Sequence, residues 1–363
     1  MNNNKKKIII FNPSIEDGGV EKNLYIIANY LAKKKMNIDL ISSDFNKKNK
    51  FLSQINFIHS NIFIHKNSGR YLKYLSCLIS LVKNIYKDRN CIVFSFQANI
   101  YATIICWLLN TKIIARLNTA PQGWDHNYFK SKIYSYFIKK VDIAIVNSEI
   151  FKREVDKRYN INSILIHNPF EFFKIKNLSK KKIKYNFDPK KINLINVGRM
   201  TEQKDQITLL KSLTKIKNKE RVTLSIIGKG QKKNELISFV KKNNLEKNVK
   251  FFNYKNNPYP YIKGADVFVL SSKYEGSPNV LVEAQILNKY IFSTNCPTGP
   301  KEILRNYKKG KLFNVGDFNK LAILIANFRK KKTIKDNYFY SGLEKYRKEY
   351  NCKKYLEAIQ SLN

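Results

Sequence analysis

The feature that most constrains the fold is a repeated alternation of short apolar runs with stretches of helical period. After the first run, Val20, Leu24, Ile27 and Leu31 recur at the spacing of one helix face. The strands expected in the first half are residues 7–12, 37–42, 62–65, 91–96, 112–117, 142–147 and 163–167. Because helices fit between most of these runs, the pattern predicts a parallel sheet covered on both faces.

A second series of this kind follows a break in the rhythm. Residues 168–191 hold two Asx-Pro steps and clustered lysines, which indicates an interdomain linker with some local structure. The strands expected beyond it are residues 192–197, 222–227, 249–252, 267–270, 290–294 and 311–313. The fold class is therefore α/β, with two Rossmann-like doubly wound domains whose carboxyl strand ends are expected to face a central cleft.

A length of 363 residues suits two domains. We expect an N-terminal domain over residues 1–170 and a linker over 171–191. A second domain over 192–335 follows, and then C-terminal helices over 336–363 that can pack back on the first domain.

Residues 91–111 carry no formal charge and must be tested as a membrane span, since about 20 apolar residues cross a bilayer. Ser95, Gln97 and Asn99 would be costly in lipid, so a buried strand followed by a buried helix is the better interpretation. We find no signal-peptide apolar region after the basic N-terminus. Five cysteines without pairing or metal-site spacing predict a reducing compartment. The expected location is cytoplasmic, with peripheral attachment to the inner face of the cytoplasmic membrane as one version.

The formal net charge of +41 leaves three interpretations open. It can be a compositional effect, a nucleic-acid interface, or adhesion to an anionic membrane surface. Nucleic acid is disfavoured, because no helix-turn-helix, zinc-finger or RNP pattern appears and the lysines do not interleave with an aromatic platform. The charge is compatible with a peripheral enzyme whose acceptor is anionic or lipid-anchored.

The strongest chemical signal lies in residues 271–284, directly after an expected strand. Ser277 followed by Pro278 is typical of a helix start, which places Glu275 in the loop at the sheet edge. Free N–H groups and the dipole at such a helix start favour a phosphate. Glu283 lies one to two turns further along, where a carboxylate can bind vicinal hydroxyls. A capped surface helix with two solvated glutamates is the alternative.

Glycine-containing turns follow other expected strands. Gly198 allows close approach of the backbone, and its neighbours Arg199 and Lys204 can converge on a diphosphate. An ordinary pair of surface cations is the alternative there. Two further turns carry Gly228-Lys-Gly230 and Gly18-Gly19, and each can equally be simple βα turn chemistry.

Together these segments resemble the retaining, nucleotide-sugar-dependent glycosyltransferases of family 4, which have the two-Rossmann GT-B fold. The resemblance covers nearly the whole chain and depends on the order of modest motifs. These are Gly18-Gly19-Val20-Glu21, Val197-Gly198-Arg199 with Lys204-Asp205, Gly228-x-Gly230, Glu275-Gly276-x-Pro278 with Glu283, and Asn295-Cys-Pro-Thr-Gly-Pro-Lys-Glu302.

The resemblance implies that the N-terminal domain, residues 1–170, binds the acceptor and that residues 192–335 bind the nucleotide sugar. It also implies roles for single residues. Arg199 and Lys204 would hold the donor diphosphate, Glu275 would contact the transferred sugar, and Glu283 would hold the ribose. Arg199, Lys204 and Glu275 are thus the expected catalytic residues. The other implied donor contacts are Gly18, Gly19, Gly198, Gly228, Gly230, Gly276, Ser277, Pro278, Asn279, Val280 and Gly299.

The resemblance also implies chemistry without a cofactor or metal ion, and no Asp-x-Asp motif is evident in either half. Breaking the anomeric C–O bond leaves negative charge on the nucleotide diphosphate, which Arg199, Lys204 and a helix N-terminus would stabilise. The acceptor would attack from the leaving-group face. From the resemblance alone, a UDP-sugar is preferred over a GDP-sugar. The expected transfer is of a hexose or N-acetylhexosamine to a glycan or lipid-linked oligosaccharide in bacterial surface polysaccharide synthesis.

The acceptor side is less specified. Arg116, Asn118 and Gln97 lie at or after the ends of expected strands, so they are predicted to face the cleft and contact the acceptor. His126 is a fourth predicted contact, with a plain surface histidine as its alternative. Two other functions stay open: a non-catalytic nucleic-acid- or membrane-binding protein on the same fold, and a sugar-nucleotide epimerase. An epimerase would need an acid–base pair beside the sugar, which we do not find.

Overall fold

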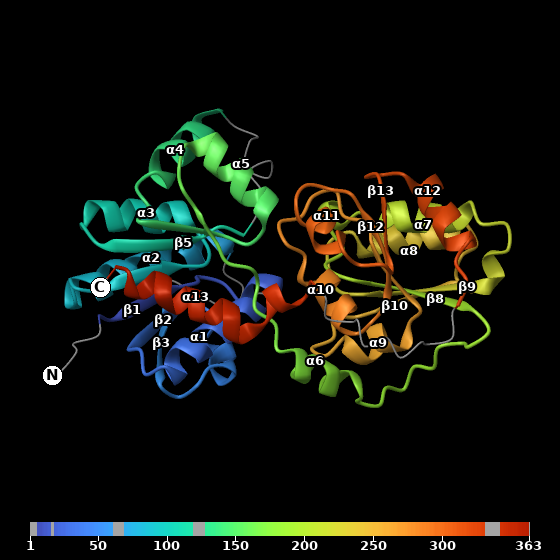
Figure 1. The fold of residues 1–363 in the computed structure, drawn as a ribbon, viewed down its shortest axis with the longest axis horizontal. Coiled ribbons are helices and arrows are strands. Elements are labelled where there is room, and N and C mark those ends of the chain that lie inside the picture. The colour runs from blue at the N-terminus through green and yellow to red at the C-terminus, as the bar shows by residue number, and fades with distance from the viewer. Residues whose placement is uncertain (1–5, 16–17, 61–68, 119–127, 331–341, 363) are drawn as a thin grey trace. The chain divides into compact units, whose positions relative to one another are not determined.

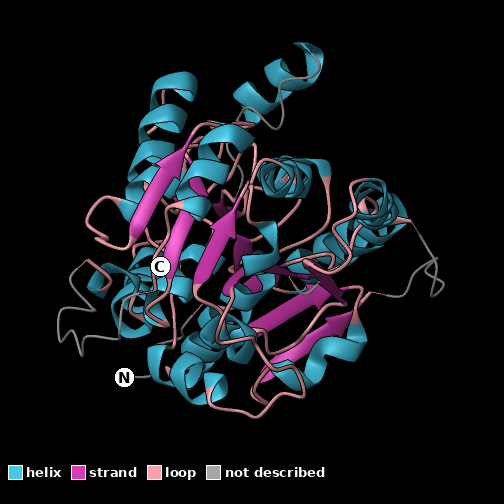
Figure 2. Cartoon of the chain, turned by 90° about the vertical axis from the view of Figure 1, so that its right-hand side faces the viewer, coloured by secondary structure: helices cyan, strands magenta, loops and turns pink. Residues whose placement is uncertain are grey.

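A computed structural model describes residues 6–15, 18–60, 69–118, 128–330 and 342–362, and every structural statement below concerns these ranges. The chain divides into two compact units, residues 1–170 with 345–363 and residues 171–344. Each unit contains one sheet in which all strand pairs are parallel, and helices pack against it (Figure 2). The predicted α/β class with two doubly wound sheets is confirmed.

The first unit contains a seven-stranded sheet in the order β3-β2-β1-β4-β5-β6-β7. Its strands are β1 (Ile8–Phe11), β2 (Ile38–Ser42), β3 (Ile55–His59), β4 (Ile92–Ser95), β5 (Lys112–Arg116), β6 (Ile143–Val146) and β7 (Ile164–Leu165). Its α-helices are α1 (Gly19–Lys33), α2 (Arg70–Lys87), α3 (Asn99–Leu108), α4 (Tyr128–Ile138), α5 (Glu149–Tyr159) and α13 (Lys348–Gln360).

The two faces of this sheet are covered by different helices. On one face, α1 and α13 pack side by side over a core that includes Leu24 and Tyr355 (Figure 1). On the other face, α2 and α3 contribute Cys77 and Cys106 to a second core. The chain enters α13 through a parallel bridge between Phe170 and Arg347, so the C-terminal helix belongs to the first unit although it follows the second in sequence.

The second unit contains a six-stranded sheet in the order β10-β9-β8-β11-β12-β13. Its strands are β8 (Ile192–Val197), β9 (Val222–Ile227), β10 (Val249–Phe252), β11 (Val267–Leu270), β12 (Tyr290–Thr294) and β13 (Gly310–Phe313). Its α-helices are α6 (Phe172–Ser179), α7 (Gln206–Thr214), α8 (Lys233–Lys242), α9 (Tyr259–Gly264), α10 (Asn279–Ile286), α11 (Gly299–Leu304) and α12 (Phe318–Ala326).

Most expected elements are present, and the differences have simple causes. The strand predicted over residues 62–65 lies outside the described residues, whereas β3 was not predicted. In β3, Ile55 and Phe57 are buried but Asn56 between them is exposed, so this edge strand alternates and lacks the continuous apolar run of its neighbours. Residues 171–191 belong to the second unit and contain α6.

Residues 91–111 form β4 and α3, which confirms the strand-and-helix interpretation over a single span. Within the described part of the chain, no helix is both long and apolar enough to cross a membrane. All five cysteines lie in the described part of the chain, where they are buried and no disulfide joins any two of them.

Candidate functional site

Glu275 is fixed by the crossing of two loops at the carboxyl edge of the second sheet. Its backbone N–H donates to the Pro297 carbonyl at 2.6 Å, and the Thr298 N–H donates to the Glu275 carbonyl at 2.8 Å. The Thr298 hydroxyl also donates to the Gly276 carbonyl at 3.1 Å. The β11–α10 and β12–α11 loops therefore hold each other, as expected for strand ends that meet at one sheet edge.

The Glu275 carboxylate pairs with Lys204. Lys204 Nζ lies 2.5 Å from Glu275 Oε1, and the Ser272 hydroxyl donates to the same oxygen at 2.6 Å. The two side chains are 17% and 7% exposed, respectively. The cation and the hydrogen bond compensate the cost of burying this carboxylate. The structure thus brings together two of the three predicted catalytic residues, from separate loops.

Arg199, the third predicted catalytic residue, is exposed on the β8–α7 loop. That loop crosses the β9–α8 loop closely. A Cβ atom added at Gly228 would lie 1.9 Å from the Gly198 carbonyl oxygen, and one at Gly230 would lie 2.2 Å from the Met200 carbonyl oxygen. Glycine is therefore required at 228 and 230 by backbone packing within the protein, which supports the turn interpretation for this pair.

Gly198 differs from these two glycines. A Cβ atom there would meet only the Lys204 side chain, at an ordinary contact distance of 3.8 Å. The fold itself has room for a side chain at this position. Packing within the protein therefore does not require a glycine at position 198. The approach of a bound donor to this backbone stays the predicted reason for the glycine.

Helix α10 begins one residue later than predicted. Its N-cap is Pro278 in place of Ser277, and Asn279 is its first residue. A Cβ atom at Gly299 would lie 2.3 Å from the Gly276 carbonyl oxygen, so these two backbones also need close contact. Val280 follows on the first turn, half-buried. The helix still starts beside Glu275, with its N-terminal N–H groups at the same sheet edge.

Glu283 lies inside α10 and is 1% exposed. The Tyr259 hydroxyl donates to Glu283 Oε1 at 3.1 Å. Burial and, next, the negative charge of Glu283 raise the pKa of Tyr259, so the phenol stays a hydrogen-bond donor at neutral pH. With Glu275 only 6% exposed, the alternative of two solvated surface glutamates is wrong.

Cys296 is a site neighbour to which the sequence analysis gave no role. Burial and, next, the charge of Glu275 raise the pKa of its thiol to about 12. Cys296 is therefore a neutral thiol at physiological pH and supplies no thiolate nucleophile.

Arg116 does not fit its predicted role as an acceptor contact. It is 1% exposed, and its Nε donates to the Tyr355 hydroxyl at 2.9 Å while a terminal nitrogen donates to Asn168 Oδ1 at 2.6 Å. The other terminal nitrogen contacts Asn118 Oδ1. These contacts tie β5 to the C-terminal helix α13. The prediction failed because α13, distant in sequence, covers the end of this strand.

The other predicted contacts of the first unit lie near the start of α1. Glu21 accepts hydrogen bonds from the Gly18 backbone N–H at 2.8 Å and from Gln97 Nε2 at 3.0 Å, so this buried glutamate joins the two. Gly19 is the first residue of α1. Gln97 Oε1 is buried and has no hydrogen-bond partner in the described part of the chain. The sequence analysis named Glu21 within the Gly-Gly motif but gave it no role. Its position at N3 of α1 is the sequence signal for such a role, because a glutamate there can accept a hydrogen bond from the N-cap backbone N–H.

Asn118 donates from Nδ2 to the Phe96 carbonyl at 2.7 Å, so it also braces the ends of neighbouring strands. His126 lies outside the described residues. For both, the predicted acceptor contact stays a prediction.

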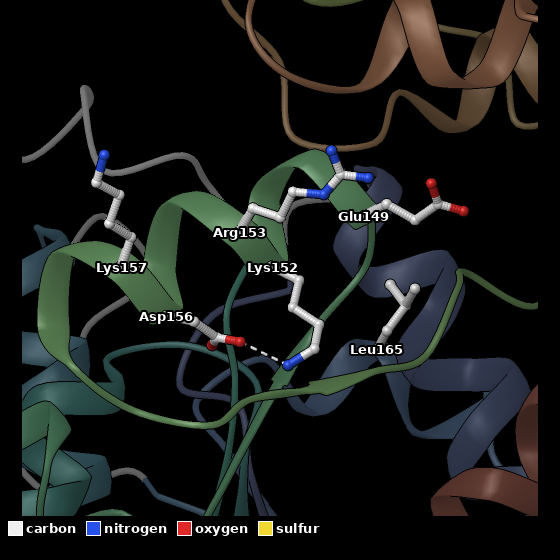
Figure 3. A pocket seen from close by; sticks show the side chains of 6 residues that line it. All are labelled: Glu149, Lys152, Arg153, Asp156, Lys157 and Leu165. Atoms are coloured by element: carbon white, nitrogen blue, oxygen red, sulfur yellow. Dashed lines mark hydrogen bonds and ion pairs between the residues drawn. The ribbon is translucent and has the colours of Figure 1, made fainter.

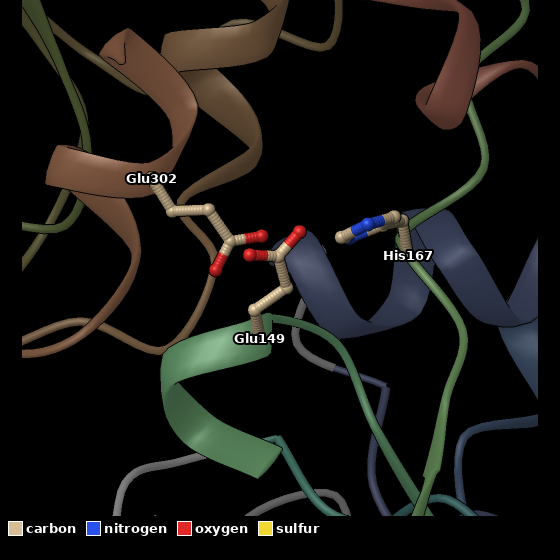
Figure 4. Close-up of side chains that lie close together, drawn as sticks. All are labelled: Glu149, His167 and Glu302. Carbon is tan, nitrogen blue, oxygen red and sulfur yellow. The ribbon is translucent and has the colours of Figure 1, made fainter. Parts of the chain in front are cut away.

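Two other polar groupings do not include Glu275. A depression in the first unit is lined by Leu165 and by α5 side chains that include Lys152 and Asp156, whose charged groups pair with each other (Figure 3). Figure 4 draws Glu149 and His167 of the first unit together with Glu302, a residue of α11 in the second unit. Burial lowers the pKa of His167 to about 4, so this histidine is neutral at physiological pH. These three residues do not form a site within either unit.

The arrangement in the second unit, a doubly wound sheet with a Lys–Glu pair beside a helix start, belongs to a known class. Residues 178–360 match the family described as glycosyl transferases group 1, and residues 17–171 match Glycosyltransferase Family 4. The chain belongs to the group 1 glycosyl transferases, as its motifs had indicated.

Named relatives agree with this assignment. An uncharacterized glycosyltransferase of Methanocaldococcus jannaschii is 34% identical over 206 residues, which cover 54% of this chain and 51% of the relative. The capsular polysaccharide biosynthesis glycosyltransferase CapM of Staphylococcus aureus is 24% identical, with 92% of this chain and 91% of the relative covered. The alignment with the archaeal relative thus spans about half of that protein's length.

Solved structures share the fold. The HepE protein of Anabaena, crystallised in complex with UDP, superposes with a TM-score of 0.76 at 16% identity over 98% of this chain and 100% of that one. Sucrose-phosphate synthase of Thermosynechococcus elongatus gives a TM-score of 0.80 at 14% identity, with 99% of each chain covered. These likenesses confirm the two-domain GT-B fold.

Proposed function

We propose that this protein is a retaining glycosyltransferase that moves a hexose or N-acetylhexosamine from a UDP-sugar to a glycan or lipid-linked oligosaccharide. The observation that carries the proposal is the buried pair of Lys204 and Glu275 beside the start of α10. Relatives named for capsule and lipopolysaccharide synthesis, such as LpsE of Rhizobium meliloti, support a surface polysaccharide as the product.

The donor diphosphate would bind between the β8–α7 loop and the N-terminus of α10. Arg199 supplies an exposed guanidinium, which can bind two phosphate oxygens at once. Lys204 supplies a point charge. As the anomeric C–O bond breaks, negative charge grows on the diphosphate, and these cations together with the helix N–H groups stabilise it.

Glu275 has a different task from the cations. While no donor is bound, its carboxylate compensates Lys204. When a diphosphate attracts Lys204, Glu275 becomes available to accept hydrogen bonds from hydroxyls of the transferred sugar. Ser272 keeps the carboxylate oriented through its hydroxyl. The leaving phosphate itself would take the acceptor proton, and the reaction would need no metal ion.

A nucleotide-sugar panel tests the donor. We expect UDP and a UDP-sugar to raise Tm in a thermal-shift assay more than their GDP and ADP counterparts, because ligand binding to the native state stabilises it by mass action. EDTA should leave both the shift and donor hydrolysis unchanged. Absence of a response to every nucleotide sugar would overturn the proposal, and an inverted product anomer in an NMR spectrum would overturn its retaining mechanism.

A matched pair of lysine variants tests the site. Lys204→Ala should lower the rate of donor hydrolysis by about 10²–10³, the usual effect of losing one such electrostatic donor. Lys273→Ala is the control, because Lys273 lies in the β11–α10 loop but pairs with Glu202 instead of Glu275. Equal losses in the two variants would contradict the assignment.

A further inference from the structure

Helix α2 presents several of its large apolar residues to solvent and part of its polar surface to the protein. Leu72 and Leu75 are 47% and 54% exposed, and Tyr86 further along the helix is 58% exposed. By contrast, Ser76 and Ser80 are 1% and 7% exposed. The sheet side is already filled by Cys77 and its neighbours in the core. The outward apolar stripe therefore lies outside the described core of this unit.

The two following helices repeat this pattern. On α3, Tyr101, Trp107 and Leu108 are 52%, 47% and 67% exposed, and on α4, Ile133 and Tyr136 are 51% and 52% exposed. Nine of the fifteen exposed large hydrophobic side chains in the described part of the chain lie on α2, α3 and α4. Such a concentration on three helices exceeds the single exposed apolar residues that ordinary surfaces carry.

The three helices form one continuous layer. Helix α3 packs against both α2 and α4 on one face of the sheet (Figure 1). The Trp107 ring on α3 lies 5.9 Å from the Phe137 ring on α4, in an edge-to-face arrangement. We call this layer the α2–α4 face, defined by residues 70–87, 99–108 and 128–138. Its exposed large apolar side chains are tyrosine, tryptophan, leucine and isoleucine, and tyrosine and tryptophan are the residues enriched at membrane–water interfaces.

Charge decides what kind of partner this face fits. The helices α2, α3 and α4 contain no aspartate or glutamate, although the chain has 27 acidic residues. Lys83 and Lys87 on α2 and Lys132 on α4 are exposed, as are Lys139 and Lys140 just after α4. Asp142 nearby pairs with Lys112. Asp88, which directly follows α2, is half-buried. The described edge of this apolar surface therefore carries more lysines than acidic residues, which makes it complementary to an anionic surface.

We propose that the α2–α4 face docks on an anionic phospholipid surface, with its aromatic and aliphatic side chains at the headgroup level and its lysines on lipid phosphates. A second copy of this chain is a poorer partner, because a two-fold contact would bring the same cations of both copies together. Membrane docking also accounts for lysines beside apolar side chains. A lysine can extend its ammonium group toward a lipid headgroup while its aliphatic stem covers apolar surface.

Vesicle binding of the full-length protein tests this without any donor or acceptor, so its outcome is independent of the proposed transferase activity. We expect co-sedimentation with phosphatidylcholine vesicles that contain phosphatidylglycerol, and little with phosphatidylcholine alone. Binding should weaken in 1 M NaCl, where the Debye length falls to about 3 Å. It should not disappear, because the apolar contacts remain.

Matched variants locate the binding surface. The double variant Leu75→Ser/Leu108→Ser should bind anionic vesicles roughly tenfold or more weakly. Tyr350→Ser/Ile323→Ser is the control, with residues 52% and 53% exposed on α13 and α12. Lys83→Gln/Lys87→Gln should bind roughly 30-fold more weakly. Its control, Lys241→Gln/Lys242→Gln, removes the same charge from exposed lysines of α8.

Three results would overturn the proposal. One is equal binding of the wild-type protein to neutral and anionic vesicles. Another is a control pair that weakens binding as much as its counterpart on the α2–α4 face. The third is a wild-type protein that does not bind vesicles but forms a dimer in light scattering, where the Leu75→Ser/Leu108→Ser variant is a monomer. That result would assign the face to a second copy of the chain. Circular dichroism and Tm of each variant must match wild type, as expected for exposed positions.

Discussion

Two glycine-to-alanine substitutions separate packing within the protein from binding of a donor. At Gly228, an added Cβ atom would lie 1.9 Å from the Gly198 carbonyl oxygen, whereas real Cβ atoms essentially never come within 3.0 Å of such an atom. Gly228→Ala must therefore move the two loops apart by about 1.1 Å. At Gly198, the same added atom meets only the flexible Lys204 side chain at 3.8 Å.

The magnitudes follow from these distances. Forcing an extra methyl group into a packed region costs about 1–3 kcal/mol. For a unit the size of residues 171–344, that corresponds to a fall in Tm of about 3–10 °C. Since Arg199 lies on the displaced loop, kcat/KM for donor hydrolysis should also fall by about 10²-fold, as for other misplacements near 1 Å.

Gly198→Ala should behave differently, because its strain is small in the free protein. We expect Tm within about 1 °C of wild type but at least tenfold weaker UDP binding in isothermal titration calorimetry, since the methyl group would occupy the space through which a donor phosphate approaches the backbone. Gly69→Ala is the control, with nothing within 4 Å of its added Cβ atom. A wild-type Tm for Gly228→Ala, or wild-type UDP affinity for Gly198→Ala, would refute this reasoning.

Three further predictions concern other residues. Glu275→Ala should abolish sugar transfer while UDP affinity in calorimetry stays within a few-fold of wild type, because the diphosphate contacts remain; a parallel loss of UDP affinity would contradict its role at the sugar. Arg116→Ala should lower the free energy of unfolding in urea by about 2–4 kcal/mol, because the buried Asn168 Oδ1 and Tyr355 hydroxyl each lose the hydrogen bond that Arg116 donates. An unchanged midpoint of urea unfolding would contradict this. His167 has a folded-state pKa of about 4, below its unfolded value, so the unfolded chain binds the proton more readily and stability should fall between about pH 6.5 and 4, by up to about 3 kcal/mol; equal pH profiles for His167→Asn and wild type would rule this out.

The second unit was the more predictable of the two, for a physical reason. Its strands are buried on both faces and read as short apolar runs such as residues 267–270, and polar residues directly after a parallel strand must lie at the ligand-binding edge. That rule places Glu275 and Lys204 at the same sheet edge, and the family resemblance implied that both act on one donor. It could not reveal that they form a buried ion pair, because a pairing across 71 residues depends on side-chain directions that spacing does not specify.

The first unit shows where that rule fails. Arg116 ends a parallel strand as Glu275 follows one, yet it is buried under Tyr355. The difference comes from α13, which returns to this unit after an intervening domain. The local sequence around a strand end does not indicate whether a segment distant in the chain will pack over it. A strand-end position therefore predicts a functional residue only where no later segment of the chain covers it.

Helix α2 shows a related limit and connects it to function. Leu72 and Leu75 recur at a helical period, and so do Cys77, Leu81 and Ile85, so the helix is apolar on more than one face. Periodicity cannot say which face meets the sheet, and counting apolar residues would assign both to the core. The structure resolves the choice, because Cys77, Leu81 and Ile85 fill the core and leave the leucines outside. The exposed parts of that outward stripe add little to the stability of this unit, so their presence beside lysines, on helices without aspartate or glutamate, is best explained by the anionic surface proposed above.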